Sequence, residues 1–367
     1  MINSESCTVV SGLRAAVVCA GFVARTTVLA VLAVLAAAPD CAVAEPQCVP
    51  QCVAATEPAL FESGRLTKCC EYTSGIEGPA VDAAGTLYVM NLRQQGTQQG
   101  TIGKLIPGAT QSELFATLPP GSIGNGARFD RDGRMYVADF NGNNVLVFER
   151  GQIVPRVYFH SDGCRPGGPS PCFHQPNDLA VAADGTLYAS DPSFASGKGQ
   201  IWRITRGPDG NGRGEVMLSS ERHMGATNGL DLSPDGATLY VSESTTPEDC
   251  KPPSTARCVW AYRLDGATLT APRLVKKFEG FDLDGLRTDL DGRIFVTRPG
   301  NGTVAVLAPD GTRIREIPLR GKQPSNLTFG GPDGKTVFVT QVDGGFIEAF
   351  RVDRPGREPC LQTPAAC

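Results

Sequence analysis

Six short apolar runs along the chain are each followed by a polar turn and then by a second run rich in β-branched and aromatic residues. The six copies read PAVDAAGTLYV, ARFDRDGRMYV, DLAVAADGTLYA, GLDLSPDGATLYV, GLRTDLDGRIFV and LTFGGPDGKTVFV. A glycine-containing turn between two such runs is typical of a β-hairpin. The turn glycines, spaced 48, 52, 51, 56 and 42 residues apart, are Gly85, Gly133, Gly185, Gly236, Gly292 and Gly334. This spacing indicates six repeats of one supersecondary unit.

A second, weaker pair of strands follows each hairpin, for example GTIGKLIPG then SELFATL, and GQIWRITRG then EVMLSS. Four strands in a unit of about 50 residues are typical of a propeller blade. Helical periodicity is nowhere sustained. The sequence therefore predicts an all-β, six-bladed β-propeller with four antiparallel strands per blade. The sixth unit has only three strands before Val352, so we expect a strand somewhere within Leu60 to Tyr72 to complete it and close the ring.

Residues 1–44 differ from the rest of the chain and resemble a secretory signal peptide. Val28 to Ala38 contains no polar side chain, and the small-x-small sequence Ala42 to Ala44 follows. The alternative is a membrane anchor. A single anchor that joined this stretch to the apolar stretch between Arg14 and Arg25 would place Arg25 near the bilayer centre, at a cost of about 2.5–3.5 kcal/mol. We therefore predict cleavage after Ala44 and a secreted or periplasmic protein.

The mature chain divides into three segments. We predict a Cys-rich N-terminal segment with the closing strand at 45–72, the propeller at 73–352 and a Cys-containing tail at 353–367.

The chain carries a net charge of −4, which removal of the leader leaves unchanged. A mildly acidic, unpatterned surface argues against nucleic acid and anionic membranes as partners. A small-molecule substrate is expected, and protein partners are left open.

Cysteine usage supports export. Ten cysteines remain after the predicted leader, without a CxxC pair or a CxxCH motif, and an even number in an oxidising compartment favours disulfides over metal ligands. Cys164 with Cys172 and Cys250 with Cys258 are natural local pairs around Pro-rich loops. The connectivity stays open for the six cysteines near the chain ends, namely Cys48, Cys52, Cys69, Cys70, Cys360 and Cys367.

A set of oxygen-bearing side chains recurs at one position of the repeat. The residues eight places before the turn glycines are Glu77, Asn125, Asn177, Asn228, Asp284 and Asn326. Asp, Glu and Asn account for 49 of the 367 residues, so six in six is not expected by chance. Each stands just before the innermost strand of its blade. We therefore expect these six ring positions to converge on the central axis at one mouth of the propeller.

The chemistry of this set favours a hard cation. Asn and Asp at strand starts can simply cap backbone groups, but converging carboxylates such as Glu77 and Asp284 repel each other unless a cation lies between them. Carboxylate and amide oxygens suit calcium above all, although another divalent cation would satisfy the same set. Histidine and cysteine are absent from it, which disfavours zinc and copper.

Three segments, QPNDLAVAADGTLYASDP, TNGLDLSPDGATLYVSES and PSNLTFGGPDGKTVFVTQ, resemble the gluconolactonase, regucalcin and strictosidine-synthase-like group of six-bladed propellers. The first-blade sequence EGPAVDAAGTLYV is similar to the same pattern. The resemblance implies calcium in the channel, held by residues that correspond to Glu77, Asn177, Asn228 and Asp284. It also implies lactone hydrolysis, with phosphotriesterase activity in some relatives.

We therefore predict a calcium-dependent hydrolase of lactones or related esters. The cation would polarise the carbonyl oxygen, and Asp284 would act as general base or as direct nucleophile. Asn125 and Asn326 are predicted to contact substrate. His174 precedes Asn177 on the loop entering the same mouth, where it could shuttle protons or could be an ordinary surface-loop histidine.

Two other classes of function stay open. The first is a non-catalytic propeller that binds a ligand or a protein and has a structural calcium. The fold alone favours neither reading, because propellers host many functions. The second is strictosidine-synthase-like condensation, which in that branch relies on a channel glutamate without metal. Oxygen-bearing residues in all six units argue against it.

Overall fold

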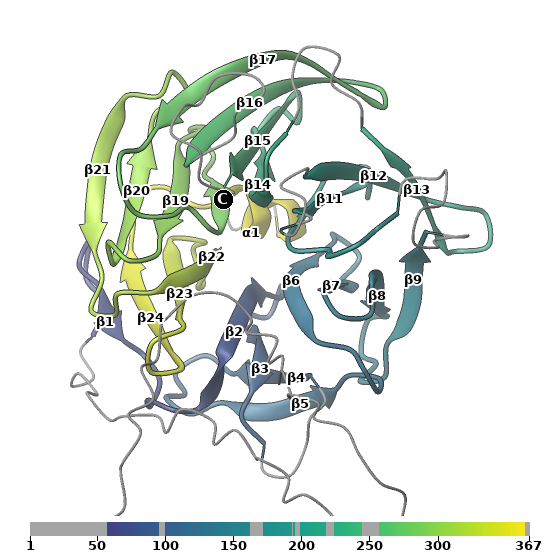
Figure 1. Ribbon diagram of the computed structural model, residues 1–367. Coiled ribbons are helices and arrows are strands. Elements are labelled where there is room, and N and C mark those ends of the chain that lie inside the picture. Colours follow the sequence, from purple (N-terminus) through teal and green to yellow (C-terminus); the bar gives the residue numbers. More distant parts are fainter. Residues whose placement is uncertain are drawn as a thin grey trace, which may run out of the picture. The chain divides into compact units, whose positions relative to one another are not determined.

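The computed structural model describes residues 57–94, 100–161, 172–192, 194, 199–217, 224–243 and 257–363. These residues form six antiparallel sheets of four strands each, arranged as blades in a ring (Figure 1). The predicted six-bladed β-propeller is confirmed. The innermost strands of neighbouring blades, β2, β6, β10, β14, β18 and β22, pack against one another around the axis.

Within each of the first five blades the strands follow one another along the chain, from the axis outward. Blade 1 contains β2 (Tyr72–Val81), β3 (Leu87–Leu92), β4 (Thr101–Leu105) and β5 (Glu113–Thr117). Blade 2 contains β6 (Gly124–Phe129), β7 (Met135–Asp139), β8 (Asn144–Phe148) and β9 (Arg156–His160). Blade 3 contains β10 (Leu179–Val181), β11 (Leu187–Asp191), β12 (Gln200–Arg206) and β13 (Gly212–Val216). Blade 4 contains β14 (Thr227–Leu232), β15 (Thr238–Glu243), β16 (Cys258–Asp265) and β17 (Thr268–Lys277). Blade 5 contains β18 (Leu286–Thr288), β19 (Ile294–Arg298), β20 (Thr303–Leu307) and β21 (Arg313–Pro318).

Blade 6 is assembled from both ends of the propeller. It contains β22 (Pro324–Gly330), β23 (Thr336–Gln341), β24 (Phe346–Arg351) and, as its outermost strand, β1 (Gly64–Arg65). In β1, Gly64 pairs with Ala349 and Arg65 pairs with Glu348 of β24. The closing strand predicted from Leu60 to Tyr72 is therefore confirmed, and it joins the last blade to the first segment of the described chain.

Hydrophobic cores lie between neighbouring blades. One buried cluster joins Tyr136 and Val147 of blade 2 to Leu187 and Trp202 of blade 3. Because each sheet is packed on both faces, all five residues of β19 are buried, whereas the outer strand β21 is largely exposed. This packing explains why the second half of each hairpin in the sequence is a continuous apolar run rather than an alternation of apolar and polar residues.

A short helix, α1 (Arg357–Gln362), follows blade 6 and lies at the centre of the ring (Figure 1). The sequence pattern did not predict it.

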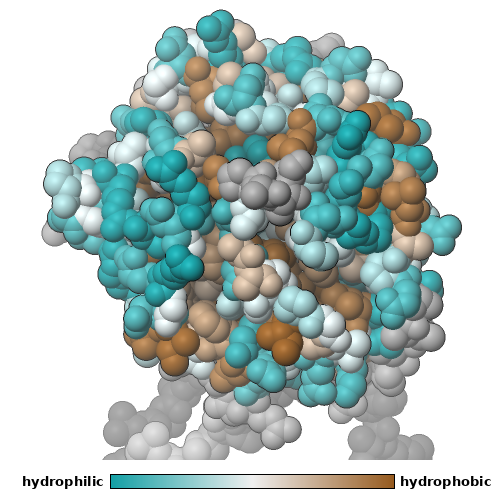
Figure 2. Space-filling view, turned by 180° about the vertical axis from the view of Figure 1, so that it is seen from behind, coloured by the Kyte–Doolittle hydropathy of each residue, from teal (hydrophilic) through white to brown (hydrophobic). Residues whose placement is uncertain are grey.

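Among the residues that the structure describes, no helix is long and apolar enough to cross a membrane. Seen from behind, the surface is mostly hydrophilic, and hydrophobic residues form several small, separate groups (Figure 2).

The predicted leader and several cysteines lie outside the described residues. These include residues 1–44, Cys164 and Cys250, whereas Cys172 and Cys258 are described and buried. Cleavage after Ala44 and the two local disulfides therefore stay predictions.

We expect non-reducing peptide mapping of the exported protein to find Cys164 linked to Cys172 and Cys250 linked to Cys258. Each bond closes a short loop and should stabilise the fold by about 2–3 kcal/mol, chiefly by restricting the unfolded chain. The same digest after reduction serves as the control, because the linked peptides should then separate. Free thiols at these four positions in the unreduced digest would show that the pairing is wrong.

Candidate functional site

The ring positions lie in or just before the inner strands, and in blades 1, 2, 4 and 6 the pairing with the second strand is irregular there. The register of β2 with β3 shifts between Glu77 and Ala80, and that of β14 with β15 shifts between Thr227 and Leu230. Such bulges re-aim a side chain away from the regular alternation of a strand. Backbone bonds also join neighbouring ring positions: Gly229 N donates to Asp284 O over 3.1 Å.

Glycine after the ring residue allows this close approach of the inner strands. A Cβ on Gly229 would lie 2.5 Å from the carbonyl oxygen of Asp284, and a Cβ on Gly78 would overlap the carbonyl oxygen of Asn125. Gly78 also has a φ of 52°, which favours glycine. In four of the six units, the ring residue is followed by glycine in the sequence, as Glu-Gly, Asn-Gly or Asp-Gly. This glycine is a further sign of the site, and the sequence analysis did not use it.

The sixth blade departs from the predicted ring by one residue. Leu327 in β22 corresponds to Leu230 in β14, since each pairs with a valine of the next strand. Two places earlier stands Asn228 in blade 4, but Ser325 in blade 6. Blade 6 has one more residue before its turn glycine, so counting back eight places stops at Asn326 instead of Ser325.

Asn326 nevertheless reaches the site from its shifted position. Its Nδ2 donates to Glu77 Oε2 over 3.1 Å, and Gly78 N donates to the same oxygen over 3.0 Å. Burial raises the pKa of the Glu77 carboxyl, and these two hydrogen bonds oppose that rise. Glu77 as a whole residue is partly exposed while Asn326 is buried, so a buried amide holds the Glu77 carboxylate in place.

Asp284 is the second carboxylate of the ring, and it lies close enough to Glu77 to repel it. Burial raises the pKa of Asp284 well above its usual value, the charge of Glu77 raises it further, and a hydrogen bond from the Asn228 side chain lowers it. The backbone of Asp284 is fixed on both sides. Its N–H donates to Thr297 O over 3.2 Å, and its carbonyl oxygen accepts from Ser242 Oγ over 2.6 Å.

The other predicted site residues differ in their surroundings. Asn125 Oδ1 is buried and has no hydrogen-bond partner among the described residues, so it is available to a ligand. Asn177 is buried, and its N–H donates to Ser190 O over 2.9 Å. His174 is exposed, and its backbone N–H donates to Asp191 Oδ2 over 2.9 Å, which anchors the loop before β10.

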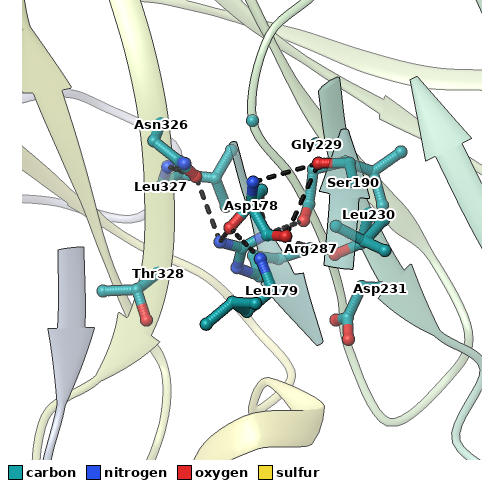
Figure 3. A network of polar contacts seen from close by, with 12 residues as sticks. Asp178, Leu179, Ser190, Gly229, Leu230, Asp231, Arg287, Asn326, Leu327 and Thr328 are labelled. Carbon is teal, nitrogen blue, oxygen red and sulfur yellow. Dashed lines mark hydrogen bonds and ion pairs between the residues drawn. The ribbon is translucent and has the colours of Figure 1, made fainter. Parts of the chain in front are cut away.

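A group of buried charges next to the ring positions was missed by the sequence reasoning. Arg287 donates from Nη1 to Asp178 Oδ2 over 2.9 Å and from Nη2 to Asn326 Oδ1 over 3.2 Å (Figure 3). Arg128 Nη2 donates to Asp178 Oδ1 over 2.7 Å. One sequence signal could have found these charges, because two repeats, ARFD and GLRT, carry an arginine inside the apolar inner strand.

Counted with every group ionised, the side chains around the axis carry more negative than positive charges. The inner strands, the residues just before β10 and β18, and α1 contribute three arginines and five carboxylates, namely Arg128, Arg287, Arg357, Asp178, Asp231, Glu358, Glu77 and Asp284. The three arginines are paired with Asp178, Asp231 and Glu358. The net excess of two negative charges falls on Glu77 and Asp284 at the mouth.

A divalent cation would compensate this excess. Among the described residues, no group of three or more His, Cys, Asp or Glu side chains is arranged to hold a metal. A metal at this mouth must therefore use amide oxygens as well as carboxylates. Calcium accepts such mixed oxygen ligands in loose geometry, so the residues present fit it.

Comparison with known proteins agrees with this geometry. Residues 164–343 match the family described as the SMP-30/Gluconolactonase/LRE-like region. The gluconolactonase of Zymomonas mobilis is 31% identical over 246 residues, which are 60% of this chain and 61% of that protein. The chain is therefore similar to the SMP-30/gluconolactonase/LRE-like family over about half of its length. The chain spans about three fifths of the length of the Zymomonas relative.

Two further proteins match over most of the propeller. Diisopropyl-fluorophosphatase from Loligo vulgaris is 26% identical over 324 residues, which are 81% of this chain and 95% of that protein. The crystal structure of a calcium-binding regucalcin from Agrobacterium tumefaciens superposes with a TM-score of 0.62 at 17% identity, and the match covers 82% of this chain and 97% of that one. Because its identity is only 17%, the regucalcin match supports the fold alone.

Proposed function

We propose that this chain is a calcium-dependent hydrolase of lactones or related esters. The observation that carries the proposal is the pair of uncompensated carboxylates, Glu77 and Asp284, beside amide side chains at one mouth of the channel. Relatives named gluconolactonase, pentonolactonase and 6-deoxy-6-sulfogluconolactonase support lactones as the substrate class. The diisopropyl-fluorophosphatase match extends this range toward phosphate esters.

The residues that would hold calcium are those of blades 1, 3, 4 and 5, namely Glu77, Asn177, Asn228 and Asp284. They contribute two negative charges, which match one divalent ion. The hydrogen bond between Asn228 and Asp284 places an amide and a carboxylate of neighbouring blades together. The charge of Glu77 raises the pKa of Asp284, and a cation between the two carboxylates would remove this repulsion.

Each residue of the mouth then has a chemical role. Calcium would supply polarisation of the substrate carbonyl oxygen. Asp284 would take a proton from the attacking water, or would attack the carbonyl itself to form an acyl anhydride that water then hydrolyses. In either case the ring C–O bond breaks and the ring oxygen leaves, with a proton, as the hydroxyl group of the product acid. The backbone of Asp284 is held on both sides for either task. The buried Oδ1 of Asn125 would accept a hydrogen bond from a substrate hydroxyl. His174 would contact substrate from the loop above, where its exposure leaves it free to move.

A panel of sugar lactones assayed with and without a calcium chelator tests the proposal. We expect hydrolysis of at least one lactone, a loss of about 100-fold or more when the chelator is added, and recovery with excess calcium. A magnesium control separates a specific need for calcium from a need for any divalent ion. If the protein binds calcium but hydrolyses no lactone in the panel, the ion is structural and the propeller is a binding module.

A further inference from the structure

Helix α1 lies across the end of the channel opposite the ring positions. The helix and the residue before it contact every blade. These contacts join Gln362 to Val81, Glu358 to Arg128, Arg357 to Val181 and Asp231, and Gly356 to Asp289 and Gly334. Several of these partners stand at the far ends of the inner strands. The helix therefore closes the channel at the end away from the proposed calcium site.

Glu358 reaches from α1 into the buried charges of the channel. Its carboxylate contacts Arg128 Nε over 2.7 Å and Arg287 Nε over 3.7 Å, and it accepts from Thr328 Oγ1 over 3.3 Å. The side chains of Arg128 and Arg287 are only 1% and 0% exposed. Without Glu358, these two buried guanidinium groups would share the single carboxylate of Asp178, which is costly in a buried site.

A continuous set of contacts runs from Glu358 to the mouth. Arg287 Nε forms an ion pair with Glu358 over 3.7 Å without a hydrogen bond, and Arg287 Nη2 donates to Asn326 Oδ1 over 3.2 Å. Leu327 N donates to the same oxygen over 2.9 Å. Because Oδ1 accepts both donors, the Nδ2 of Asn326 must face Glu77, to which it donates over 3.1 Å. Reversing the amide would set its NH₂ group against two N–H donors.

We propose that Glu358 is a positioning residue for Glu77, acting through Arg287 and Asn326. The C-terminal helix is then part of the site, because it fixes the guanidinium group that orients the Asn326 amide. The inference rests on the proposed function where it concerns calcium, but the contacts that carry it involve protein atoms alone. Partners of this kind, which orient metal ligands without touching the metal, typically change metal affinity by about 10–100-fold when removed.

A double-mutant cycle on the full mature chain tests this path. We expect Glu358→Gln to raise the calcium dissociation constant on the order of 10-fold, measured by calorimetric titration with calcium chloride. Asn326→Leu should raise it at least as much. The double variant should bind calcium no more weakly than Asn326→Leu alone, because both changes break the same path. Losses that simply multiply in the double variant would overturn the proposal.

Two further variants make the cycle interpretable. Arg354→Gln breaks an exposed ion pair with Asp291, whose atoms lie 2.9 Å apart just before α1, and it should leave calcium affinity unchanged. Glu358→Asp keeps the charge and should lose less affinity than Glu358→Gln. It takes the place of Glu358→Gln in the cycle if that variant does not fold. Equal losses for Asp and Gln would contradict a role for the charge.

Urea unfolding in the presence of a chelator separates this inference from the proposed function. The proteins to unfold are the parent, the two single variants of the cycle and the double variant. The changes in the free energy of unfolding caused by Glu358→Gln and Asn326→Leu should also be non-additive, because the contacts do not require the ion. If the parent binds no calcium, the proposed function fails and the urea cycle decides the inference alone. Additive free energies there would refute the path from Glu358 to Glu77.

Discussion

Asp284→Asn is expected to reduce lactone hydrolysis by about 10²–10⁴-fold even when the variant is saturated with calcium. The carboxamide keeps the size of the side chain and can still present an oxygen to the ion. It cannot take a proton from water or form an acyl intermediate, so the chemical step loses its base or nucleophile. The backbone contacts of Asp284 to Thr297 and Ser242 do not involve the side chain, so the fold should be retained.

The measurement is the rate at saturating lactone over a range of calcium concentrations that reaches full occupancy of the variant. Asp282→Asn makes the same chemical change two residues away, at an exposed aspartate, and should hydrolyse lactones like the parent. If the calcium-saturated Asp284→Asn protein also matches the parent, Asp284 has no chemical role and serves only as a ligand.

Glu77→Gln is expected to weaken calcium binding by about 100-fold or more, because it removes one of the two charges that face the ion. Removal of partners outside the ligand set already costs about 10–100-fold, and Glu77 is proposed to touch the ion itself. The glutamine oxygen can still accept from Gly78 N and Asn326 Nδ2. Without calcium the variant should be at least as stable as the parent, since the repulsion from Asp284 is gone.

Calorimetric titration and thermal unfolding with and without calcium measure both parts of this expectation. Calcium should raise the unfolding temperature of the parent by mass action, and the rise should be lost in Glu77→Gln. Glu113→Gln, an exposed change on β5 of the same blade, is the matched control and should respond to calcium as the parent does. Parent-like calcium affinity in Glu77→Gln would remove Glu77 from the ligand set.

The six blades were predictable because each is a local unit. A hairpin needs only residues close in sequence, so the turns before Gly85 and Gly292 and the apolar runs around them were sufficient. Closure by a strand near Gly64 followed from counting strands in the last blade. The convergence of Glu77 and Asp284 followed in turn from ring geometry, since equivalent positions of a closed propeller face one axis.

The parts that were missed depend on contacts between distant segments. Strand register in blade 6 is set by pairing across the sheet, as between Leu327 and Val339, so one additional turn residue shifted the count without a visible mark in the sequence. The pairing of Arg128 with Glu358 joins an inner strand to a helix far along the chain. A single sequence shows that both residues are charged, but not that they meet.

Calcium occupancy and lactone hydrolysis, measured on the same samples of the purified protein as free calcium is varied, test the central claim most directly. One ion should bind per chain, and the hydrolysis rate should rise with occupancy and have the same midpoint. The double variant Glu77→Gln/Asp284→Asn should show neither binding nor hydrolysis over that range. A hydrolysis rate in the parent that stays constant while occupancy falls to zero would contradict a calcium-dependent site at this mouth.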